Sequence, residues 1–330
     1  MMRLLTGLLL LGVLLAGGLG YYALTPLALP NEPLDFTLKP GSSLKSAARQ
    51  MHEAGVLSAE LPFVALARVM GKAGQLKAGG YELKEPVTPV RLLEMLSNGE
   101  FSQVQLSVIE GWSFRQLRAA LDASPDVAHD SRGLSEAKIL QRIGAEGTAA
   151  EGMFFPDTYL FSRGESDLTV LKLAHQAMAR EMERLWTGRD ADLPFESPYQ
   201  ALILASIVEK ETGAPSDRAM IAAVFENRLR LGMPLQTDPS VIYGLGERFD
   251  GNLRRADLTA DTPYNTYTRG GLTPTPISLP GVAALQAVLH PAQSKALYFV
   301  ARGDGSSEFS ETLEQHNRAV ARFQLRAGKK

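Results

Sequence analysis

The chain contains no cysteine among its 330 residues. Disulfide bonds, thiolate metal ligands and cysteine nucleophiles are therefore excluded, and so is a lipoprotein anchor, which needs a cysteine to acylate. Strongly basic runs are also missing apart from Lys329-Lys330, and the formal net charge is −2. We expect no nucleic-acid partner, because binding nucleic acid needs a concentrated positive surface.

Several catalytic signatures are absent as well. The five histidines form no His-Glu-x-x-His pattern, and no phosphate-binding glycine loop occurs, so we expect neither a metal nor a cofactor. There is no Gly-x-Ser-x-Gly elbow. Ser135-Glu-Ala-Lys138 matches the Ser-x-x-Lys start of a penicillin-binding active site, but the partner motifs Ser-Asp-Asn and Lys-Thr-Gly are missing. A helix cap is the better interpretation of this segment.

The N-terminal segment over residues 4–24 carries no charge and has about the length that spans a bilayer. Arg3 precedes it and no positive charge follows closely, which predicts a cytoplasmic stub over residues 1–3 and everything downstream outside. A cleaved signal peptide is the alternative, because Ala16-Gly17-Gly18 supplies small residues after a leucine-rich stretch. We expect retention, since apolar character continues past these glycines.

The rest of the chain is 45% hydrophobic and 21% charged overall, as in globular proteins, and is long enough for two or three domains. A proline-bounded linker over residues 25–33 leads into a strand, helix, helix, strand order within residues 34–99. That order resembles the LysM module, a small carbohydrate-binding fold. We expect residues 100–150 to be a connecting α+β segment and residues 151–330 to form a larger mixed α+β domain.

The chain is organised around Leu202–Gly213, an almost unbroken apolar helix that ends in two carboxylates. At about 100° per residue, Glu211 falls in the most apolar sector of this helix and Glu209 faces elsewhere. Burial and the negative end of the helix dipole both raise the pKa of a carboxyl there, as a general acid requires. An equally supported alternative is that residues 209–211 form a solvent-exposed last turn of the helix, in which neither carboxylate is buried. Gly213 is the expected helix stop.

Three segments rich in glycine, proline, aromatic and polar residues follow, over residues 235–244, 263–268 and 270–277. Such a rigid, irregular wall is where binding sites are built. Asp238 before Pro239 also fits a helix N-cap. The candidate substrate-binding residues in these segments are Gln236, Asp238, Tyr243, Asn265 and Tyr267.

An aromatic cluster around a proline opens the second half of the chain, Glu151-Gly-Met-Phe-Phe-Pro-Asp-Thr-Tyr159. Aromatic side chains of this kind either fill a core or offer a surface on which sugar rings stack. Core packing is the favoured interpretation.

A set of motifs in fixed order carries a family resemblance: Ala205-Ser-Ile-Val-Glu-Lys-Glu-Thr212, Asn227-Arg-Leu, Leu235-Gln-Thr-Asp-Pro239, Val241-Ile-Tyr-Gly244, Tyr264-Asn-Thr-Tyr267 and Gly271-Leu272. Together they resemble the membrane-bound endolytic murein transglycosylases, the MltG or YceG-like family, over essentially the whole chain. Thr273 departs from the family pattern Gly-Leu-Pro-Pro-x-Pro-Ile, in which a proline stands at this position. The departure leaves the shape of that loop open.

The resemblance implies lytic cleavage of the bond between N-acetylmuramic acid and N-acetylglucosamine, with a 1,6-anhydro end as product. Ordinary glycosidases need two carboxylates, whereas a single carboxyl suffices when the muramic 6-hydroxyl is the nucleophile. The family's catalytic glutamate falls on Glu211. Glu209 is then a supporting residue, paired with an arginine such as Arg218 or Arg228.

The implied partners are peptidoglycan glycan strands, the inner membrane through residues 4–24, and penicillin-binding peptidoglycan synthases. The implied location is the inner membrane, with a cytoplasmic N-terminus and a periplasmic catalytic domain. Two alternatives stay open. One is a hydrolase that uses Glu211 with Asp238, and the other is a non-enzymatic scaffold that binds peptidoglycan through the LysM-like module.

Overall fold

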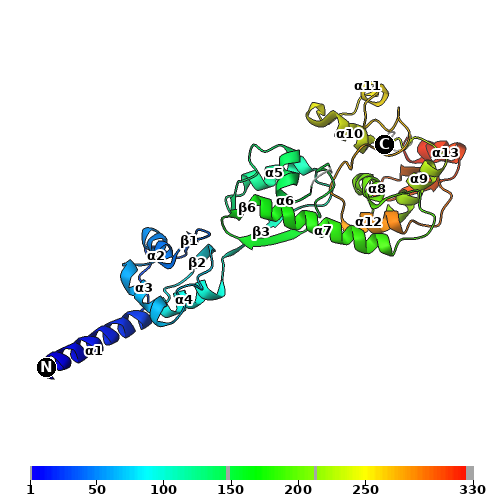
Figure 1. Ribbon diagram of the computed structural model, residues 1–330. Coiled ribbons are helices and arrows are strands. Elements are labelled where there is room, and N and C mark those ends of the chain that lie inside the picture. Colours follow the sequence, from blue (N-terminus) through cyan, green and yellow to red (C-terminus); the bar gives the residue numbers. More distant parts are fainter. Residues whose placement is uncertain (1, 146–148, 212–213, 325–330) are drawn as a thin grey trace. The chain divides into compact units, whose positions relative to one another are not determined.

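The computed structural model describes residues 2–145, 149–211 and 214–324 (Figure 1). The chain divides into two compact units. Unit 1 comprises Met1–Gln105, Ser124–Asp130 and Leu160–Asp167, and unit 2 comprises Leu106–Ala123, Ser131–Tyr159 and Leu168–Lys330. The boundary falls inside β3 (Gln103–Ser107) and β5 (Thr158–Ser162), which pair with each other. The domain limits expected from the sequence stay predictions.

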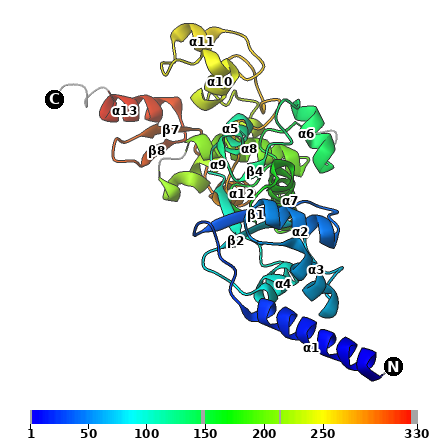
Figure 2. The ribbon, with the colours of Figure 1, turned by 90° about the vertical axis from the view of Figure 1, so that its left-hand side faces the viewer.

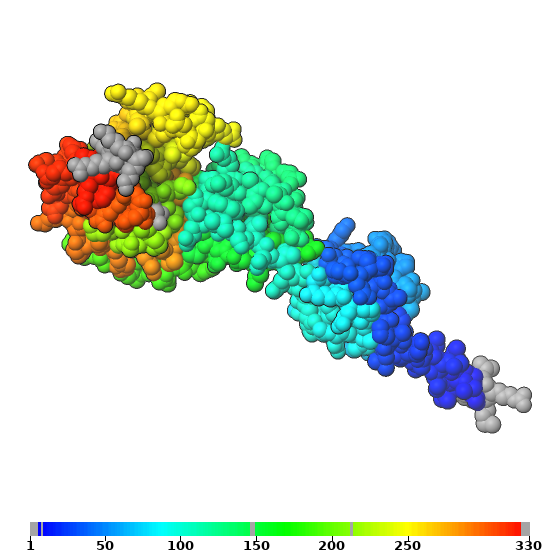
Figure 3. Space-filling model, turned by 180° about the vertical axis from the view of Figure 1, so that it is seen from behind, coloured from blue at the N-terminus to red at the C-terminus, as the bar shows by residue number. Residues whose placement is uncertain are grey.

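Unit 1 begins with helix α1 (Met2–Leu24), most of which extends away from the remainder of the unit (Figures 2 and 3). Its end reaches the core of unit 1 through Ala23, which is 6% exposed. Within the described residues no helix is both long and apolar enough to cross a membrane. The membrane span expected over residues 4–24 is therefore not confirmed.

The next four elements of unit 1 are β1 (Leu34–Leu38), α2 (Leu44–Glu53), α3 (Glu60–Val69) and β2 (Gly79–Leu83). The strands are antiparallel, with Leu34 opposite Leu83, and alternate residues of β1 are buried, as the two-residue period of a strand requires. The expected strand, helix, helix, strand order is present. The likeness to a LysM module stays a prediction. The unit also contains α4 (Pro89–Asn98) and the short parallel pair β4 (Val127–Ala128) and β6 (Glu165–Ser166).

Unit 2 holds most of the described helices and the antiparallel hairpin near the C-terminus, so the expected mixed α+β class is confirmed. Its elements are α5 (Phe114–Ala123), α6 (Glu136–Ile143), α7 (Asp167–Thr187), α8 (Pro198–Glu211), α9 (Arg218–Arg230), α10 (Asp238–Leu245), α11 (Arg255–Thr259), α12 (Val282–Leu289), β7 (Tyr298–Ala301), β8 (Ser307–Ser310) and α13 (Leu313–Phe323), with 3-10 turns at Pro215–Asp217 and Gly246–Arg248. Helix α13 packs against the β7–β8 hairpin (Figure 2).

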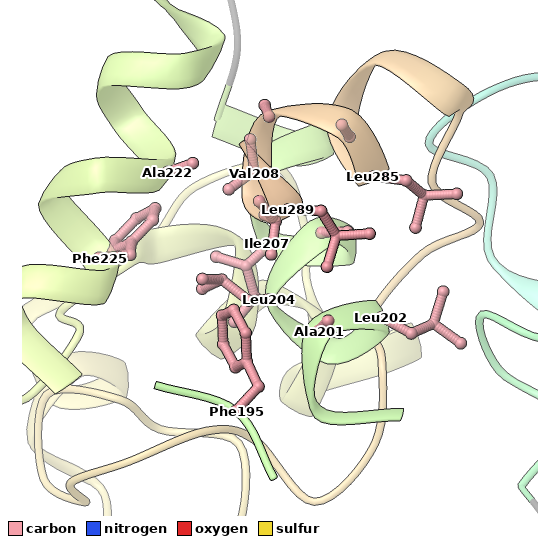
Figure 4. Packing of buried hydrophobic residues seen from close by; sticks show 14 of the residues in the cluster. Phe195, Ala201, Leu202, Leu204, Ile207, Val208, Ala222, Phe225, Leu285 and Leu289 are labelled. Atoms are coloured by element: carbon pink, nitrogen blue, oxygen red, sulfur yellow. The ribbon is translucent and has the colours of Figure 1, made fainter. Parts of the chain in front are cut away.

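Helix α8 is the centre of the unit 2 core. Every residue from Ala201 to Val208 is buried, because the helix is apolar on all sides and is covered by α9, α10 and α12. Figure 4 shows Ile207 and Val208 between Phe225 of α9 and Leu289 of α12. Packing on all sides fixes the position of the last turn of α8, which carries the candidate acid.

One polar residue within α8 ties the helix to a distant loop. The Ser206 hydroxyl accepts a hydrogen bond from the Ile277 N–H at 2.9 Å, and the Ser278 hydroxyl donates to the Ser206 carbonyl at 2.9 Å. In the same loop Thr273 is buried, and its hydroxyl donates to the Thr275 carbonyl at 2.8 Å. A side-chain hydrogen bond therefore stabilises the turn where the family pattern has a proline.

Candidate active site

The two carboxylates at the end of α8 contact different parts of unit 2. Glu209 accepts a hydrogen bond from the Gly281 N–H at 2.9 Å and lies 3.9 Å from the Arg218 guanidinium. Glu211 instead accepts a hydrogen bond from the Thr237 hydroxyl at 2.5 Å. The helical-wheel prediction that the two side chains diverge is confirmed. The predicted helix stop, Gly213, lies outside the described residues.

The environment of Glu211 raises the pKa of its carboxyl. Burial is the largest cause, and the nearby negative charge of Asp238 acts in the same direction, whereas the hydrogen bond from Thr237 lowers the pKa. The net effect keeps more of the carboxyl protonated near neutral pH than in a solvated glutamate. This environment favours the inward-facing interpretation of the last turn over the solvated one.

Glu211 opens into a pocket of about 460 Å³. Three of the predicted substrate-binding residues, Gln236, Asp238 and Tyr267, line the same pocket. The Tyr267 hydroxyl donates to the Asp238 carboxylate at 2.5 Å, and burial together with that carboxylate raises the pKa of Tyr267. Acid, carboxylate and phenol thus face one space that is large enough for part of a sugar chain.

Another wall of this pocket comes from β7 and α13, which the sequence did not point to. Tyr298 and His316 lie there with stacked rings, 5.2 Å apart between centroids. Burial and the neighbouring Arg228 both lower the pKa of His316, which favours its neutral form.

A backbone strained at one residue directs Thr237 toward Glu211. Gln236 has a φ of +53°, in the left-handed region that non-glycine residues rarely adopt. The Gln236 N–H donates to the Thr266 carbonyl at 3.1 Å, and the Thr237 N–H donates to the Thr266 hydroxyl at 3.0 Å. Two loops far apart in sequence therefore hold the turn beneath the acid.

Helix α10 begins at Asp238, and its N-cap is Thr237. The prediction that Asp238 is the N-cap is wrong by one residue. The Thr237 side chain makes no cap hydrogen bond, because its hydroxyl is used on Glu211. Asp238 lies in the first turn of α10, where a negative charge still interacts favourably with the helix dipole.

The arginine that pairs with Glu209 is Arg218. Arg228, the other candidate, is buried and donates to the backbone carbonyls of Leu297 at 2.7 Å and Leu235 at 2.9 Å. Arg228 thereby joins β7 to the loop before α10 and stabilises two walls of the Glu211 pocket.

Two predicted substrate-binding residues lie elsewhere. Asn265 is fully buried, and its amide nitrogen donates to three backbone carbonyls, those of Asp257, Leu258 and Ala260. Its amide oxygen accepts from the Tyr267 N–H at 2.9 Å, so Asn265 shapes the loop that presents Tyr267. Tyr243 lines a second pocket on α10.

This second pocket has a volume of about 790 Å³ and contains a carboxyl that sequence reasoning missed. Glu151 is 7% exposed and accepts hydrogen bonds from the Phe114 N–H at 3.0 Å and the Tyr243 hydroxyl at 3.1 Å. Burial raises the pKa of Glu151 to about 7. Phe154 from the same segment is fully buried and stacks on Phe114, as the core interpretation predicts. The available signal was a lone carboxylate at the start of an aromatic stretch.

These observations define a mixed α+β protein in which the partly buried carboxyl of Glu211 faces a polar and aromatic pocket. Within the described residues, no cluster of three or more histidine, aspartate or glutamate side chains is arranged to hold a metal ion. The chain belongs to the YceG-like family, whose sequence model matches residues 36–322.

Two bacterial proteins are similar in sequence to most of this chain. The endolytic murein transglycosylase of Bacillus subtilis is 29% identical over 317 residues, which covers 88% of this chain and 84% of that protein. The endolytic murein transglycosylase of Streptococcus pneumoniae is 28% identical over 355 residues, covering 95% of this chain and 64% of that protein. The crystal structure of a YceG-like protein from Listeria monocytogenes is similar with a TM-score of 0.54 and 28% identity, covering 87% of this chain and 98% of that one.

Proposed function

We propose that this protein is an endolytic murein transglycosylase that cleaves the N-acetylmuramic acid to N-acetylglucosamine bond in peptidoglycan glycan strands, with Glu211 as general acid and base. The observation that carries the proposal is the position of Glu211, a carboxyl of raised pKa that faces a pocket. The family match and the names of the relatives support the reaction class.

The proposed reaction uses one carboxyl twice. Glu211 donates its proton to the glycosidic oxygen while the bond from that oxygen to C1 of the muramic residue breaks. The 6-hydroxyl of the same muramic residue then bonds to C1 and releases its proton to the Glu211 carboxylate. The products are a 1,6-anhydro end and a free 4-hydroxyl on N-acetylglucosamine, and Glu211 is protonated again. A raised pKa supports this cycle, because the resting group must carry a proton.

The neighbouring side chains have distinct proposed roles. The Asp238 carboxylate, oriented by Tyr267, stabilises the positive charge that develops at C1. Gln236 supplies an exposed amide at the edge of the pocket. Glu209 supports the site without contacting the substrate. Its hydrogen bond from the Gly281 N–H and its ion pair with Arg218 hold the last turn of α8 in place.

A hydrolase that uses Asp238 as a second carboxylate is the competing candidate, since Asp238 lines the Glu211 pocket. Mass spectrometry of digested glycan separates the two reactions. Lytic cleavage gives 1,6-anhydro ends, which are one water lighter than the reducing ends left by hydrolysis. Intact glycan after incubation would instead favour the non-enzymatic scaffold and contradict both enzymatic proposals.

We also propose that residues 4–24 attach the protein to the inner membrane, with residues 1–3 in the cytoplasm and the catalytic domain in the periplasm, where peptidoglycan synthases act. The exposed leucines of α1 support attachment, since Leu9, Leu14 and Leu15 are 69%, 73% and 66% exposed. Deletion of residues 2–20 should move the protein from the membrane fraction to the soluble fraction. Retention of the shortened protein on membranes in high salt would contradict the proposal.

The module over residues 34–99 is the proposed second glycan contact, which its strand, helix, helix, strand order supports. Deleting it should weaken retention on insoluble peptidoglycan while the thermal transition of residues 151–330 persists. Unchanged retention would argue against a LysM-like role.

A further inference from the structure

We propose that the 790 Å³ pocket on α10 is a subsite for a muramic residue of the glycan strand, and that Lys210 binds the carboxylate of the lactyl substituent or of the stem peptide attached to it. The inference rests on the proposed murein substrate. The reaction at Glu211 does not itself require this pocket, Lys210 or a carboxylate on the substrate.

The two pockets are lined at two places by residues that are consecutive in the chain. Glu211 and Asp238 line the smaller pocket, whereas Lys210 and Pro239 line the larger one. Neighbouring Cα atoms are about 3.8 Å apart, so both pockets reach the end of α8 and the start of α10. A polymer that is cut at Glu211 can therefore extend into the pocket on α10, as an enzyme that cuts within a strand requires.

Lys210 is the available cation of this pocket. Its ammonium group is exposed, donates to the Gly111 carbonyl at 3.3 Å, and forms no salt bridge with any described residue. Arg115, the other cation in the lining, is already paired with Glu247 at 3.2 Å. Muramic acid differs from N-acetylglucosamine by a lactyl group that ends in a carboxyl, and this is the anion that Lys210 can bind.

The remaining walls suit a sugar with a peptide or lactyl substituent. The rings of Tyr243 and Tyr264 meet edge to face with centroids 4.9 Å apart, and Phe249 and Ile242 add apolar surface. Glu151 binds the Tyr243 hydroxyl and so acts as a positioning residue for that ring. Aromatic faces of this kind pack against the apolar faces of sugar rings.

Acidic groups around the pocket select the position that a carboxylate can take. Glu136 and Glu151 lie in the lining, Glu209 precedes Lys210, and Glu247 forms an exposed ion pair with Arg115. An anionic substituent is repelled by Glu136 and is stabilised only near Lys210. The pocket therefore discriminates a muramic residue by the direction in which its substituent points.

The test measures binding in the Glu211→Gln background, so that the strand stays intact. The probes are murein strands with stem peptides, amidase-treated strands with free lactyl groups, and a chitin oligosaccharide that has neither. We expect Lys210→Met to weaken binding of both kinds of murein strand about tenfold and to reduce its dependence on salt, with no change for the chitin oligosaccharide. Lys210→Arg should restore most of the affinity. Lys172→Met, which removes an exposed charge outside both pockets, is the matched control.

The outcomes separate cleanly. Weakening of only the peptide-bearing strands assigns the carboxylate to the stem peptide, and weakening of only the amidase-treated strands assigns it to the lactyl group. Unchanged binding of both murein probes, or an equal loss for murein and chitin, would overturn the subsite. If wild-type digests contain no 1,6-anhydro ends but the binding pattern appears, the proposed reaction fails and the subsite stands.

Discussion

Glu211 and Glu151 are two carboxyl groups of unit 2 whose pKa values are raised by the same main cause, burial, yet their surroundings differ. Both oxygens of Glu151 accept hydrogen bonds, from the Phe114 N–H and the Tyr243 hydroxyl, and its residue is only 7% exposed. Glu211 accepts one side-chain hydrogen bond, from Thr237, and opens into a pocket. Glu151 also lines a pocket, but both of its oxygens are bound by groups of the fold, whereas Glu211 is half-buried and faces the pocket in which Asp238 and Tyr267 lie.

A raised pKa alone does not identify a catalytic carboxyl in this protein, because the pKa values of Glu151, Glu211 and Glu226 are all raised. Structural carboxyls are perturbed by burial as readily as catalytic ones. Glu226 illustrates the point further: it is fully buried, its pKa is raised to about 8, and Arg230 lies 3.3 Å away. Glu211 differs from Glu226 because it faces a pocket, and from Glu151 because it is half-buried rather than 7% exposed and lies beside Asp238 and Tyr267.

The two carboxyls should differ most in their effect on turnover. Glu211→Gln keeps shape and hydrogen-bonding capacity but cannot cycle a proton, so kcat for release of 1,6-anhydro ends should fall by about 10²–10⁴-fold. Stability should not fall, because a neutral amide relieves the burial of a charge. The measurements are product quantification by mass spectrometry and thermal unfolding.

Glu209→Gln is the matched control, since it changes the other carboxyl of the same helix turn. Loss of activity in Glu209→Gln with near wild-type turnover in Glu211→Gln would show that the catalytic carboxyl had been misassigned.

Glu151 should give the opposite pattern. Glu151→Leu leaves the Phe114 N–H and the Tyr243 hydroxyl without an acceptor, and each unsatisfied group costs about 1–3 kcal/mol. The free energy of unfolding should fall by about 2 kcal/mol or more, which lowers Tm by about 5 °C for a unit of this size. Denaturation at pH 6 with kcat measured on the same preparation checks this. A large fall in kcat with unchanged Tm would make Glu151 the catalytic acid.

The pH dependence of stability gives a finer contrast. The folded-state pKa of Glu151 is about 7, above its ordinary value of 4.5. The folded state therefore binds more protons between these values, and the contribution of Glu151 to stability is complete below pH 4.5 and is lost as the pH rises through 7. A shift of this size corresponds to about 3 kcal/mol.

Glu151→Gln should flatten that part of the curve and leave the slope from Glu226 in place. Unfolding by denaturant between pH 4.5 and 8 measures both proteins. Parallel curves for wild type and Glu151→Gln would mean that Glu151 does not titrate in this range.

Local patterns predicted the part of the site that depends on local geometry. The helical period alone separated Glu209 from Glu211, and glycine and proline density located the wall that carries Gln236, Asp238 and Tyr267. Each of these depends on residues close together in the sequence.

The rest of the site depends on contacts between distant segments. Glu151 and Tyr243 are 92 residues apart, and His316 reaches the pocket only because α13 packs on the β7–β8 hairpin. No periodicity reports such pairings. Asn265 is an error of the opposite kind. As a polar residue in a loop it was expected to contact the substrate, but its side-chain amide forms hydrogen bonds with the backbone of its own loop. The N-cap was misplaced for a similar reason, since a tertiary partner takes the Thr237 hydroxyl.

Thr237→Val is expected to give the smallest and most specific effect, because the Thr237 hydroxyl donates a hydrogen bond to the Glu211 carboxylate. This hydrogen bond lowers the pKa of Glu211 against the larger effect of burial. Thr237→Val removes the hydroxyl with little change in volume, so the pKa of Glu211 should rise further. The alkaline limb of kcat/KM, where the protonated acid is lost, should move to higher pH, and the plateau should fall modestly because the carboxyl is less well oriented.

Thr237→Ser is the control that retains the hydroxyl, and its pH profile should match that of wild type. Both profiles are measured by release of 1,6-anhydro ends across the pH range in which the protein stays folded. A limb that stays in place or moves to lower pH in Thr237→Val would mean that a group other than Glu211 titrates in the reaction. Such a result would remove the distinction between the two carboxyls on which the assignment of Glu211 depends.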